Sequence, residues 1–187
     1  MKPRAKKCRV CKKEFTPKRS TLQKVCSLDC AKIEGARQAE KKQKAETRKM
    51  KEELMTHSAW LKKLQVTFNA YIRERDKDKP CISCGRPLKG KFDAGHFYSV
   101  GAHPELRFYP DNVHGQCVHC NRDKHGNLLE YAERLPQRIG ESAFNALKSL
   151  RGMSNKLTVW QIKDLIEVYK LKKKELILNN QKDKDNE

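Results

Sequence analysis

The residues best suited to chemistry lie in one stretch, 81–127. Two Cys-x-x-Cys pairs there enclose 32 residues, four of the six histidines lie between Cys84 and Cys120, and a fifth, His125, follows directly. A structural zinc ribbon has no need of so many imidazoles between its cysteine pairs. Phosphodiester hydrolysis does need such groups: a base to activate water, and a hard cation to hold the phosphate and the departing 3′ oxygen. The composition of this stretch therefore predicts a site that cleaves phosphodiesters.

The positions of His96, Asn112, Asn121 and His125 relative to one another support this interpretation. Asn112 follows His96 by sixteen positions, and Asn121 and His125 lie nine and thirteen positions beyond Asn112. Asn121 and His125 are thus four apart, which on an α-helix places both side chains on one face. The pattern predicts that both can point at a single metal ion.

The order of these residues resembles the HNH, or ββα-metal, endonucleases. The resemblance is carried by His96, then Asn112, then Cys-x-x-Cys-Asn followed by Lys124 and His125. It implies that two short strands and a helix clamp one Mg²⁺ or Mn²⁺. It further implies that His96 is the general base, that Asn112 on the second strand orients it, and that Asn121 and His125 bind the ion.

One position departs from that family. The residue before the base is usually Asp or His, whereas this chain has Gly95. Asp93, two residues earlier, shares a strand face with position 95 and can replace the missing ligand directly or through water. Alternatively His96 binds the ion, and His114 or His103 acts as the base. His114 is the better of these two, because it shares a strand face with Asn112.

The eight cysteines fall into close pairs that make two complete sets of four. Such sets are typical of structural zinc sites, and a chain without a secretory signal has no oxidising compartment in which to form disulfides. A closed four-sulfur site has no open position for substrate, so neither zinc is expected to do chemistry. The predicted ligands are Cys8, Cys11, Cys26 and Cys30 for one ion, and Cys81, Cys84, Cys117 and Cys120 for the other.

The charge balance predicts a polyanionic partner. Lys and Arg number 42 against 23 Asp and Glu, a formal net charge of +19. Each phosphate that such a surface neutralises releases condensed counterions, so nucleic acid gains most from it. The chain has no run of about 18 apolar residues that would span a bilayer. The expected DNA contacts are Arg107, Arg122 and Lys124 beside the site, and Lys12, Lys13 and Arg19 near the N-terminus.

A second resemblance covers the whole chain. The N-terminal CRVCKKEFTP…CSLDC and the block DAGHFYSVGAHPELRFYPDNVHGQCVHCN are similar to a family of lambdoid phage recombination proteins. That resemblance implies an endonuclease that cuts Holliday junctions and D-loops in the host cell cytoplasm, with host or phage recombination proteins as further partners. Symmetric cutting of a four-way junction needs two active sites, so a homodimer is expected. The alternatives are a zinc-dependent nucleic-acid-binding protein without catalysis, a less selective HNH nuclease, and a protein-interaction adaptor.

The elements that must position these residues predict an α+β protein. Apolar residues recur at helical spacing from Trp60 to Tyr71, from Leu128 to a stop near Pro136, and from Phe144 to a stop near Gly152. A last helix starts with Thr158 as N-cap and Gln161 three positions on. The predicted parts are a zinc knuckle at 1–30, a charged helical linker at 31–57, a nuclease domain with flanking helices at 58–178, and a disordered tail at 179–187.

Overall fold

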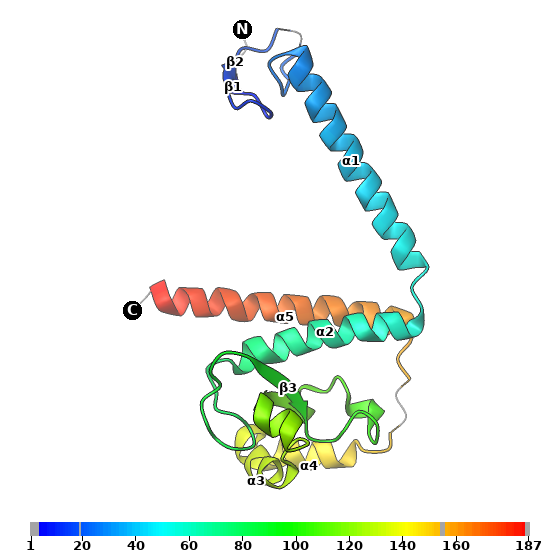
Figure 1. Cartoon of the computed structure of the whole chain (residues 1–187), viewed down its shortest axis with the longest axis vertical. Coiled ribbons are helices and arrows are strands. Elements are labelled where there is room, and N and C mark those ends of the chain that lie inside the picture. Colours follow the sequence, from blue (N-terminus) through cyan, green and yellow to red (C-terminus); the bar gives the residue numbers. More distant parts are fainter. Residues whose placement is uncertain (1–3, 19, 154–155, 186–187) are drawn as a thin grey trace. The chain divides into compact units, whose positions relative to one another are not determined.

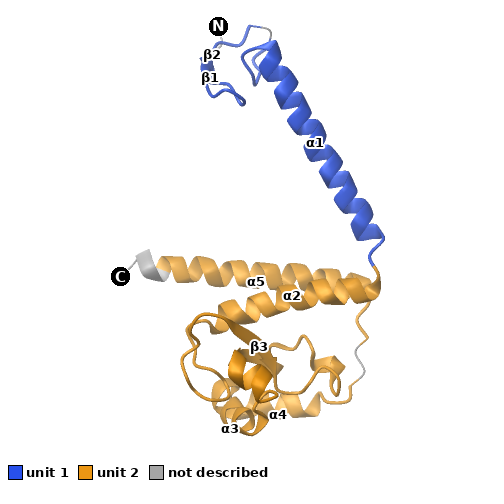
Figure 2. Cartoon of the chain, in the orientation of Figure 1, with its two compact units in different colours: residues 1–55 blue, residues 56–187 orange. Residues whose placement is uncertain are grey.

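The computed structural model describes residues 4–18, 20–153 and 156–185, with side chains as far as residue 182. Arg19, one of the expected DNA contacts, lies outside the described residues. The chain divides into two compact units, residues 1–55 and 56–187 (Figures 1 and 2). Each unit is described by itself below.

The first unit is a cysteine knuckle followed by one long helix. Strands β1 (Lys6–Lys7) and β2 (Glu14–Phe15) pair antiparallel, and helix α1 spans Leu28–Glu53. Ser27 caps this helix by accepting a hydrogen bond from the Cys30 N–H at 3.2 Å. Most of α1 is exposed, and Cys30 is its only buried residue, as expected for a helix without an apolar stripe. The charged helix is therefore confirmed, with its start three residues earlier than predicted.

The second unit is built on a pair of long helices. Helix α2 (His57–Asp76) lies alongside α5 (Val159–Asp185), as Figure 1 shows. Phe68 of α2 and Tyr169 of α5 meet edge to face with their ring centroids 4.8 Å apart. The buried residues along this contact are Trp60, Leu64, Phe68 and Ile72 on α2, and Ile162, Ile166 and Tyr169 on α5.

A two-stranded hairpin and two short helices complete this unit. Strands β3 (Phe92–His96) and β4 (Val113–Cys117) pair antiparallel, and helices α3 (Leu128–Ile139) and α4 (Glu141–Ser149) follow. Short helical turns lie between and after the strands: η1 (Pro104–Leu106), η2 (Pro110–Asn112) and the π-helical η3 (His119–Asp123). Helices and two small sheets in one chain confirm the α+β class.

The register of the hairpin assigns each side chain to a face. Asp93 pairs with Gln116, Gly95 with His114, and His96 with Val113. Directly opposed residues share a face, and neighbours along a strand alternate. The side chains of Asp93 and Gln116 therefore lie on the face opposite to that of His96.

Two helix ends differ from the sequence-based predictions. Helix α3 does not stop near Pro136 but continues to Ile139, where Gly140 at φ 85° ends it and donates its N–H to the Pro136 carbonyl. A left-handed residue terminates a helix more firmly than a proline near its end. Residues 179–187 were expected to form a disordered tail, but helix α5 continues as far as Asp185. The segment 179–185 contains no Gly or Pro that would end the helix.

Candidate active site and metal centres

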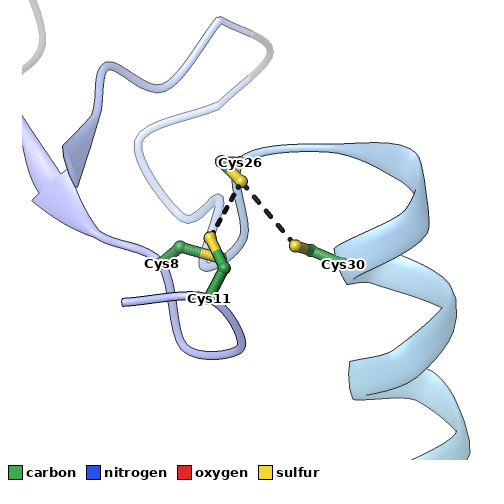
Figure 3. Close-up of side chains that lie close together, drawn as sticks. All are labelled: Cys8, Cys11, Cys26 and Cys30. Carbon is green, nitrogen blue, oxygen red and sulfur yellow. Dashed lines mark hydrogen bonds between the residues drawn. The ribbon is translucent and has the colours of Figure 1, made fainter. Parts of the chain in front are cut away.

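The first set of cysteines converges at the knuckle of the first unit (Figure 3). The sulfurs of Cys8, Cys11, Cys26 and Cys30 all lie within 4.8 Å of one another. Cys11 and Cys26 are 3.5 Å apart and Cys26 and Cys30 are 3.7 Å apart, and all four are free thiols. Four converging sulfurs are the donor set that structural Zn²⁺ prefers. The grouping predicted from the sequence is confirmed as one that could hold zinc.

The second set of cysteines lies at the foot of the hairpin. The sulfurs of Cys81, Cys84, Cys117 and Cys120 also lie within 4.8 Å of one another. Backbone N–H groups donate to two of these sulfurs: Cys117 N to Cys81 at 3.3 Å, and Cys120 N to Cys117 at 3.4 Å. Burial raises the pKa of the Cys81 thiol against the hydrogen bonds it accepts, so a bound zinc ion would itself supply the charge that stabilises the thiolates. This grouping is confirmed in the same sense, and it ties the end of β4 to η3.

The His96 imidazole has a defined tautomer. Its Nε2 lies 3.0 Å from the carbonyl oxygen of Arg107. Because a carbonyl only accepts, Nε2 must carry the proton, and Nδ1 keeps its lone pair. Burial lowers the pKa of His96, and the nearby charge of Arg107 lowers it further against the opposing effect of that hydrogen bond. His96 is therefore a neutral imidazole near pH 7 with Nδ1 able to accept a proton.

Asn112 acts on a loop and not on the His96 ring. It lies in η2, one residue before β4, and is fully buried. Its Nδ2 donates to the carbonyls of Tyr98 and Leu106 at 3.0 and 3.1 Å, and its Oδ1 accepts from the Tyr98 N–H at 2.8 Å. The expected position on the second strand is wrong by one residue. Any influence of Asn112 on His96 is indirect, through the backbone that follows β3.

Sequence reasoning missed the residue that holds Arg107. Gln65 of α2 accepts a hydrogen bond from Arg107 Nε at 2.7 Å, and its own Nε2 donates to Asn69 at 2.7 Å. No hydrogen bond from the Nη atoms of Arg107 is found among the described residues. The signal available in the sequence was a polar pair four residues apart in the middle of an amphipathic helix. Gln65 thus anchors the residue whose carbonyl orients His96.

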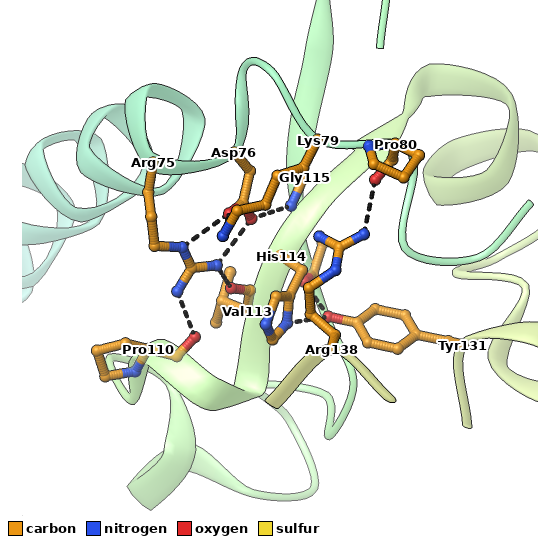
Figure 4. A network of polar contacts seen from close by, with 11 residues as sticks. Arg75, Asp76, Lys79, Pro80, Pro110, Val113, His114, Gly115, Tyr131 and Arg138 are labelled. Atoms are coloured by element: carbon orange, nitrogen blue, oxygen red, sulfur yellow. Dashed lines mark hydrogen bonds and ion pairs between the residues drawn. The ribbon is translucent and has the colours of Figure 1, made fainter. Parts of the chain in front are cut away.

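His114 is placed as a structural residue. It is 2% exposed, and its Nδ1 lies 3.1 Å from the Tyr131 hydroxyl, which donates to the Gly95 carbonyl at 3.1 Å (Figure 4). Burial lowers the pKa of His114 to about 3. A base that water cannot reach does not activate water, so the structure argues against His114 as the alternative base. His103, the other alternative, pairs with Glu105 at 3.0 Å.

A buried ion pair that the sequence analysis did not predict holds this hairpin to α2 (Figure 4). Arg75 grips the carboxylate of Asp76 with two hydrogen bonds of 2.7 and 2.8 Å, and Asp76 also accepts from the Gly115 N–H at 2.8 Å. Arg75 donates further to the carbonyls of Pro110 and Val113. Burial alone would raise the pKa of Asp76, but Arg75 and the Gly115 N–H lower it on balance. The pair fixes the start of β4, and with it Asn112.

The predicted ion ligands come together only in part. Asn121 donates to Asp93 at 3.1 Å, so these two do meet. However, Arg122 also binds both oxygens of Asp93, at 2.7 and 2.9 Å. That hydrogen bond lowers the pKa of Asp93, which stays charged. As described, the carboxylate is neutralised by an arginine, and Arg122 points at Asp93 instead of standing free for phosphate.

His125 does not share a helix face with Asn121. The segment between them is a π-helical turn, and His125 lies beyond its end in the left-handed region at φ 48°, exposed. The four-residue spacing assumed a regular α-helix, whereas left-handed residues at 125–127 end the turn. In the described parts of the chain, the groups of three or more His, Cys, Asp or Glu close enough to share an ion are the two cysteine sets. A group that joins Asp93, His96 and His125 is not found among these described residues.

The face of the hairpin that carries Asp93 nevertheless offers a second oxygen donor suited to a hard cation. Gln116 is fully buried, and its Oε1 has no hydrogen-bond partner in the described structure. A Cβ built on Gly95 would lie 2.1 Å from that oxygen. An orphaned amide oxygen on a residue that pairs across the strands with Asp93 is a donor type that Mg²⁺ and Mn²⁺ prefer. The oxygen donors present therefore fit a divalent ion, with Asp93 kept from the predicted set and Gln116 added to it.

The remaining expected DNA contacts are surface residues. Lys12, Lys13 and Lys124 are exposed, and Lys12 lies in the left-handed region at φ 62°. None of the three has an ion-pair partner among the described residues. No helix in the described chain is long and apolar enough to cross a membrane.

Comparison with known proteins adds a family. The model of the family described as Bacteriophage Lambda NinG protein matches residues 1–179. The chain belongs to the NinG family. "Protein ninG" of Escherichia phage 933W is 38% identical over 192 residues, covering 94% of this chain and 95% of that protein.

Two other NinG proteins match shorter stretches. The protein ninG of Escherichia phage lambda is 42% identical over 123 residues, which cover 66% of this chain and 60% of that protein. The protein ninG of Salmonella phage P22 is 48% identical over 96 residues, which cover 51% of this chain and 47% of that protein. No solved structure matches. Membership of the NinG family confirms the resemblance to lambdoid phage proteins. These names state no reaction or substrate, so the function is argued from the site.

Proposed function

We propose that this NinG-family chain is a metal-dependent DNA endonuclease of the HNH type that cleaves branched recombination intermediates such as Holliday junctions and D-loops. The observation that carries the proposal is the hydrogen bond from His96 Nε2 to the Arg107 carbonyl. It fixes a neutral imidazole with an unprotonated Nδ1, which is the form a general base requires.

The residues divide the chemistry among them. His96 Nδ1 takes a proton from water, the water oxygen forms a bond to phosphorus, and the bond from phosphorus to the 3′ oxygen breaks. Arg107, whose Nε is held by Gln65, presents its Nη atoms to the phosphate. A bound Mg²⁺ or Mn²⁺ would supply charge stabilisation to the phosphate and the leaving oxygen.

The substrate is argued from charge and from the family resemblance. A net charge of +19 favours the phosphate backbone as the main contact, and base-reading motifs are not evident in the sequence, which suits recognition by shape. Two symmetric incisions in a four-way junction require two active sites, so the active form is proposed to be a homodimer. Partners among host or phage recombination proteins belong to the same proposal.

The test is cleavage of a synthetic four-way junction by the zinc-loaded chain. Nicks are expected when Mg²⁺ or Mn²⁺ is added to the zinc-loaded chain, not when neither ion is added, and not with His96→Ala, whose binding to the junction survives. Equal cutting of a linear duplex would favour a less selective HNH nuclease. Binding without metal-dependent nicks in any of these conditions would contradict the proposal.

One observation favours a second candidate, a zinc-dependent nucleic-acid-binding protein without catalysis. Arg122 neutralises Asp93, as it would in a purely structural ion pair. Such a protein, with both zinc sites loaded, would bind the junction and leave it uncut whether or not Mg²⁺ is added, and His96→Ala would change neither result. The cleavage assay above therefore decides between the two.

A further inference from the structure

Gln116 has one satisfied end and one orphaned end. Its Nε2 donates to the Ser83 hydroxyl at 2.6 Å and to the Gly126 carbonyl. Because that carbonyl can only accept, the amide cannot be flipped, and Oε1 must point the other way. There it is fully buried without a hydrogen-bond partner in the described chain. A buried acceptor left unpaired costs about 1–3 kcal/mol, so a native protein keeps one only for a reason.

Gly95 leaves room for this oxygen. A Cβ at position 95 would lie 2.1 Å from Gln116 Oε1 and 3.1 Å from Gln116 Cβ, closer than real contacts allow. No residue other than glycine fits there while Gln116 keeps its rotamer. By standard bond lengths an Asp at position 95 would carry its oxygens about 2.4 Å from its Cβ. The distance from the Cβ position of residue 95 to Gln116 Oε1 is thus close to the distance from that Cβ to the carboxylate oxygens of an Asp at position 95.

The neighbours of Oε1 provide a second oxygen donor. Asp93 is the cross-strand partner of Gln116 and shares its face. Opposed residues in an antiparallel pair have Cβ atoms about 4.5–5.5 Å apart, so a carboxylate and an amide at these positions can reach one ion. The Asp93 side chain is only 17% exposed. A charged carboxylate oxygen and a neutral amide oxygen are the donors that Mg²⁺ and Mn²⁺ select over softer metals.

We propose that Gln116 Oε1 and the Asp93 carboxylate are ligands of the divalent ion, and that Gly95 is glycine so that Gln116 can take this place. This inference rests on the proposed nuclease function, which needs such an ion. Since the two ligands lie on the strand face opposite to the His96 side chain, the scissile phosphate would bind at the end of β3, where the ion and the base would approach it from opposite sides. Arg122 shares Asp93 with the ion, so binding of the ion loosens the Arg122 ion pair and turns that guanidinium toward solvent, where it can meet phosphate.

The test is Mn²⁺ binding to the full chain, with both cysteine sites first saturated with zinc and the zinc content verified. Electron paramagnetic resonance measures the free Mn²⁺ that remains. Gln116→Ala is expected to weaken Mn²⁺ binding by about tenfold or more. Gln116→Glu, which adds a charge to the proposed ligand, is expected to strengthen it. Ser83→Ala is the matched control, because it removes one of the two partners of Nε2, while the Gly126 carbonyl still holds the amide and Oε1 stays in place. The Mn²⁺ affinity of this variant should stay near that of the parent.

Equal Mn²⁺ affinity in the parent and in Gln116→Ala would overturn the inference. An equal loss of Mn²⁺ affinity in Ser83→Ala and in Gln116→Ala would also overturn it, because Gln116 would then act only through packing. Thermal unfolding of each variant identifies any that fail to fold, and the Ser83→Ala comparison holds if Gln116→Glu is one of them. Because no cleavage is measured, the outcome is separate from the nuclease test. Gln116-dependent Mn²⁺ binding without cleavage would contradict the proposed function alone.

Discussion

At the scale of single residues, the backbone carbonyl of Arg107 determines what His96 can do. The carbonyl fixes the proton on Nε2, burial keeps the ring neutral, and Asn112 holds the loop that follows the strand. Arg107 itself depends on Gln65, which lies on the neighbouring helix. Orientation of the base therefore depends on a side chain that touches neither His96 nor, in the proposed mechanism, the DNA.

Replacing Gln65 tests this dependence. Gln65→Leu removes the acceptor for Arg107 Nε, so the cleavage rate at saturating DNA should fall about ten- to a hundredfold, because small misplacements of catalytic groups are costly. Gln65→Glu keeps an acceptor and should restore most of the rate. Single-turnover kinetics measure both, with thermal unfolding to verify the fold. A Gln65→Leu enzyme that cuts at the parental rate would show that Gln65 does not position Arg107 for catalysis.

His114 should make stability depend on pH. Its pKa is about 3 in the folded chain and 6.5 in the unfolded chain, so the unfolded state binds the extra proton between these values. Stability from this group is complete above pH 6.5 and is lost as the pH falls toward 3, by about 1.4 kcal/mol per pH unit. Urea unfolding of the parent and of His114→Gln at several pH values measures the difference in slope. Parallel curves would show that His114 titrates normally.

The cysteine ligands were the residues most open to prediction, because two complete sets of closely paired thiols are typical of structural zinc sites. Asp93 and Asn121 were also rightly placed together. His125 was not, since a four-residue spacing places side chains on one face only in a regular helix. Residues 125–127 adopt positive φ, and Gly126 and Asn127, which favour that backbone, were the signal available for it. The pairing of Arg75 with Asp76 and the orphaned Gln116 depend on tertiary neighbours that no spacing records.

At the scale of elements, the hairpin and η3 form one unit joined by sulfur. Cys117 ends β4 and Cys120 lies within η3, so a zinc ion there would clamp the strand to the turn that carries Asn121 and Arg122. The turn η3 has five residues, and its side chains contact β3 through Asn121 and Arg122, which both bind Asp93. Zinc at this site is expected to position the candidate ion ligands without touching substrate.

Loss of the second zinc site should therefore destabilise the larger unit. Cys120→Ser is expected to cost several kcal/mol and to lower its Tm by about 10 °C or more. Cys26→Ser is the matched control, because it disables the first site and should leave the Tm of residues 56–187 unchanged. Calorimetry with measured zinc content follows both. Equal effects on that transition would contradict separate roles for the two sites.

Several elements were predictable from local chemistry. Thr158 and Gln161 form the expected capping box, with Thr158 N–H donating to Gln161 at 2.8 Å and Gln161 N–H to Thr158 at 3.3 Å. The apolar stripe beginning at Trp60 gave α2 its buried face. The helix ends were less predictable, because Pro136 is tolerated near the end of α3 and a charged tail can continue α5 when nothing breaks it.

At the scale of the whole molecule, charge is the main recognition device. The two compact units share an excess of cationic side chains, and the knuckle is particularly rich in them. Binding driven by released counterions falls steeply with salt, in proportion to the number of phosphates contacted. Both units are expected to contribute to that number.

Salt titration measures the contribution of the knuckle. Lys12→Gly with Lys13→Gln should reduce the slope of log K against log salt by about 2, and weaken binding of all DNA sequences alike. Glycine suits the left-handed backbone at position 12. The control pair, Lys62→Gln with Lys174→Gln, removes the same charge from exposed positions on α2 and α5 and should change the slope less. Identical slopes for the two pairs would mean that the knuckle only adds general charge. His96→Ala in every variant prevents cleavage during the titration.

The most direct test of the central claim is chemical rescue of the base. His96→Gly opens a space where the imidazole ring was, and its rate of junction cleavage should fall by about 10²–10⁴-fold. Added imidazole should restore part of that rate, saturably, and only at a pH where it is unprotonated. A His96→Gly protein that binds DNA and Mn²⁺ normally, yet either cuts at the parental rate or gains nothing from imidazole, would show that His96 is not the base.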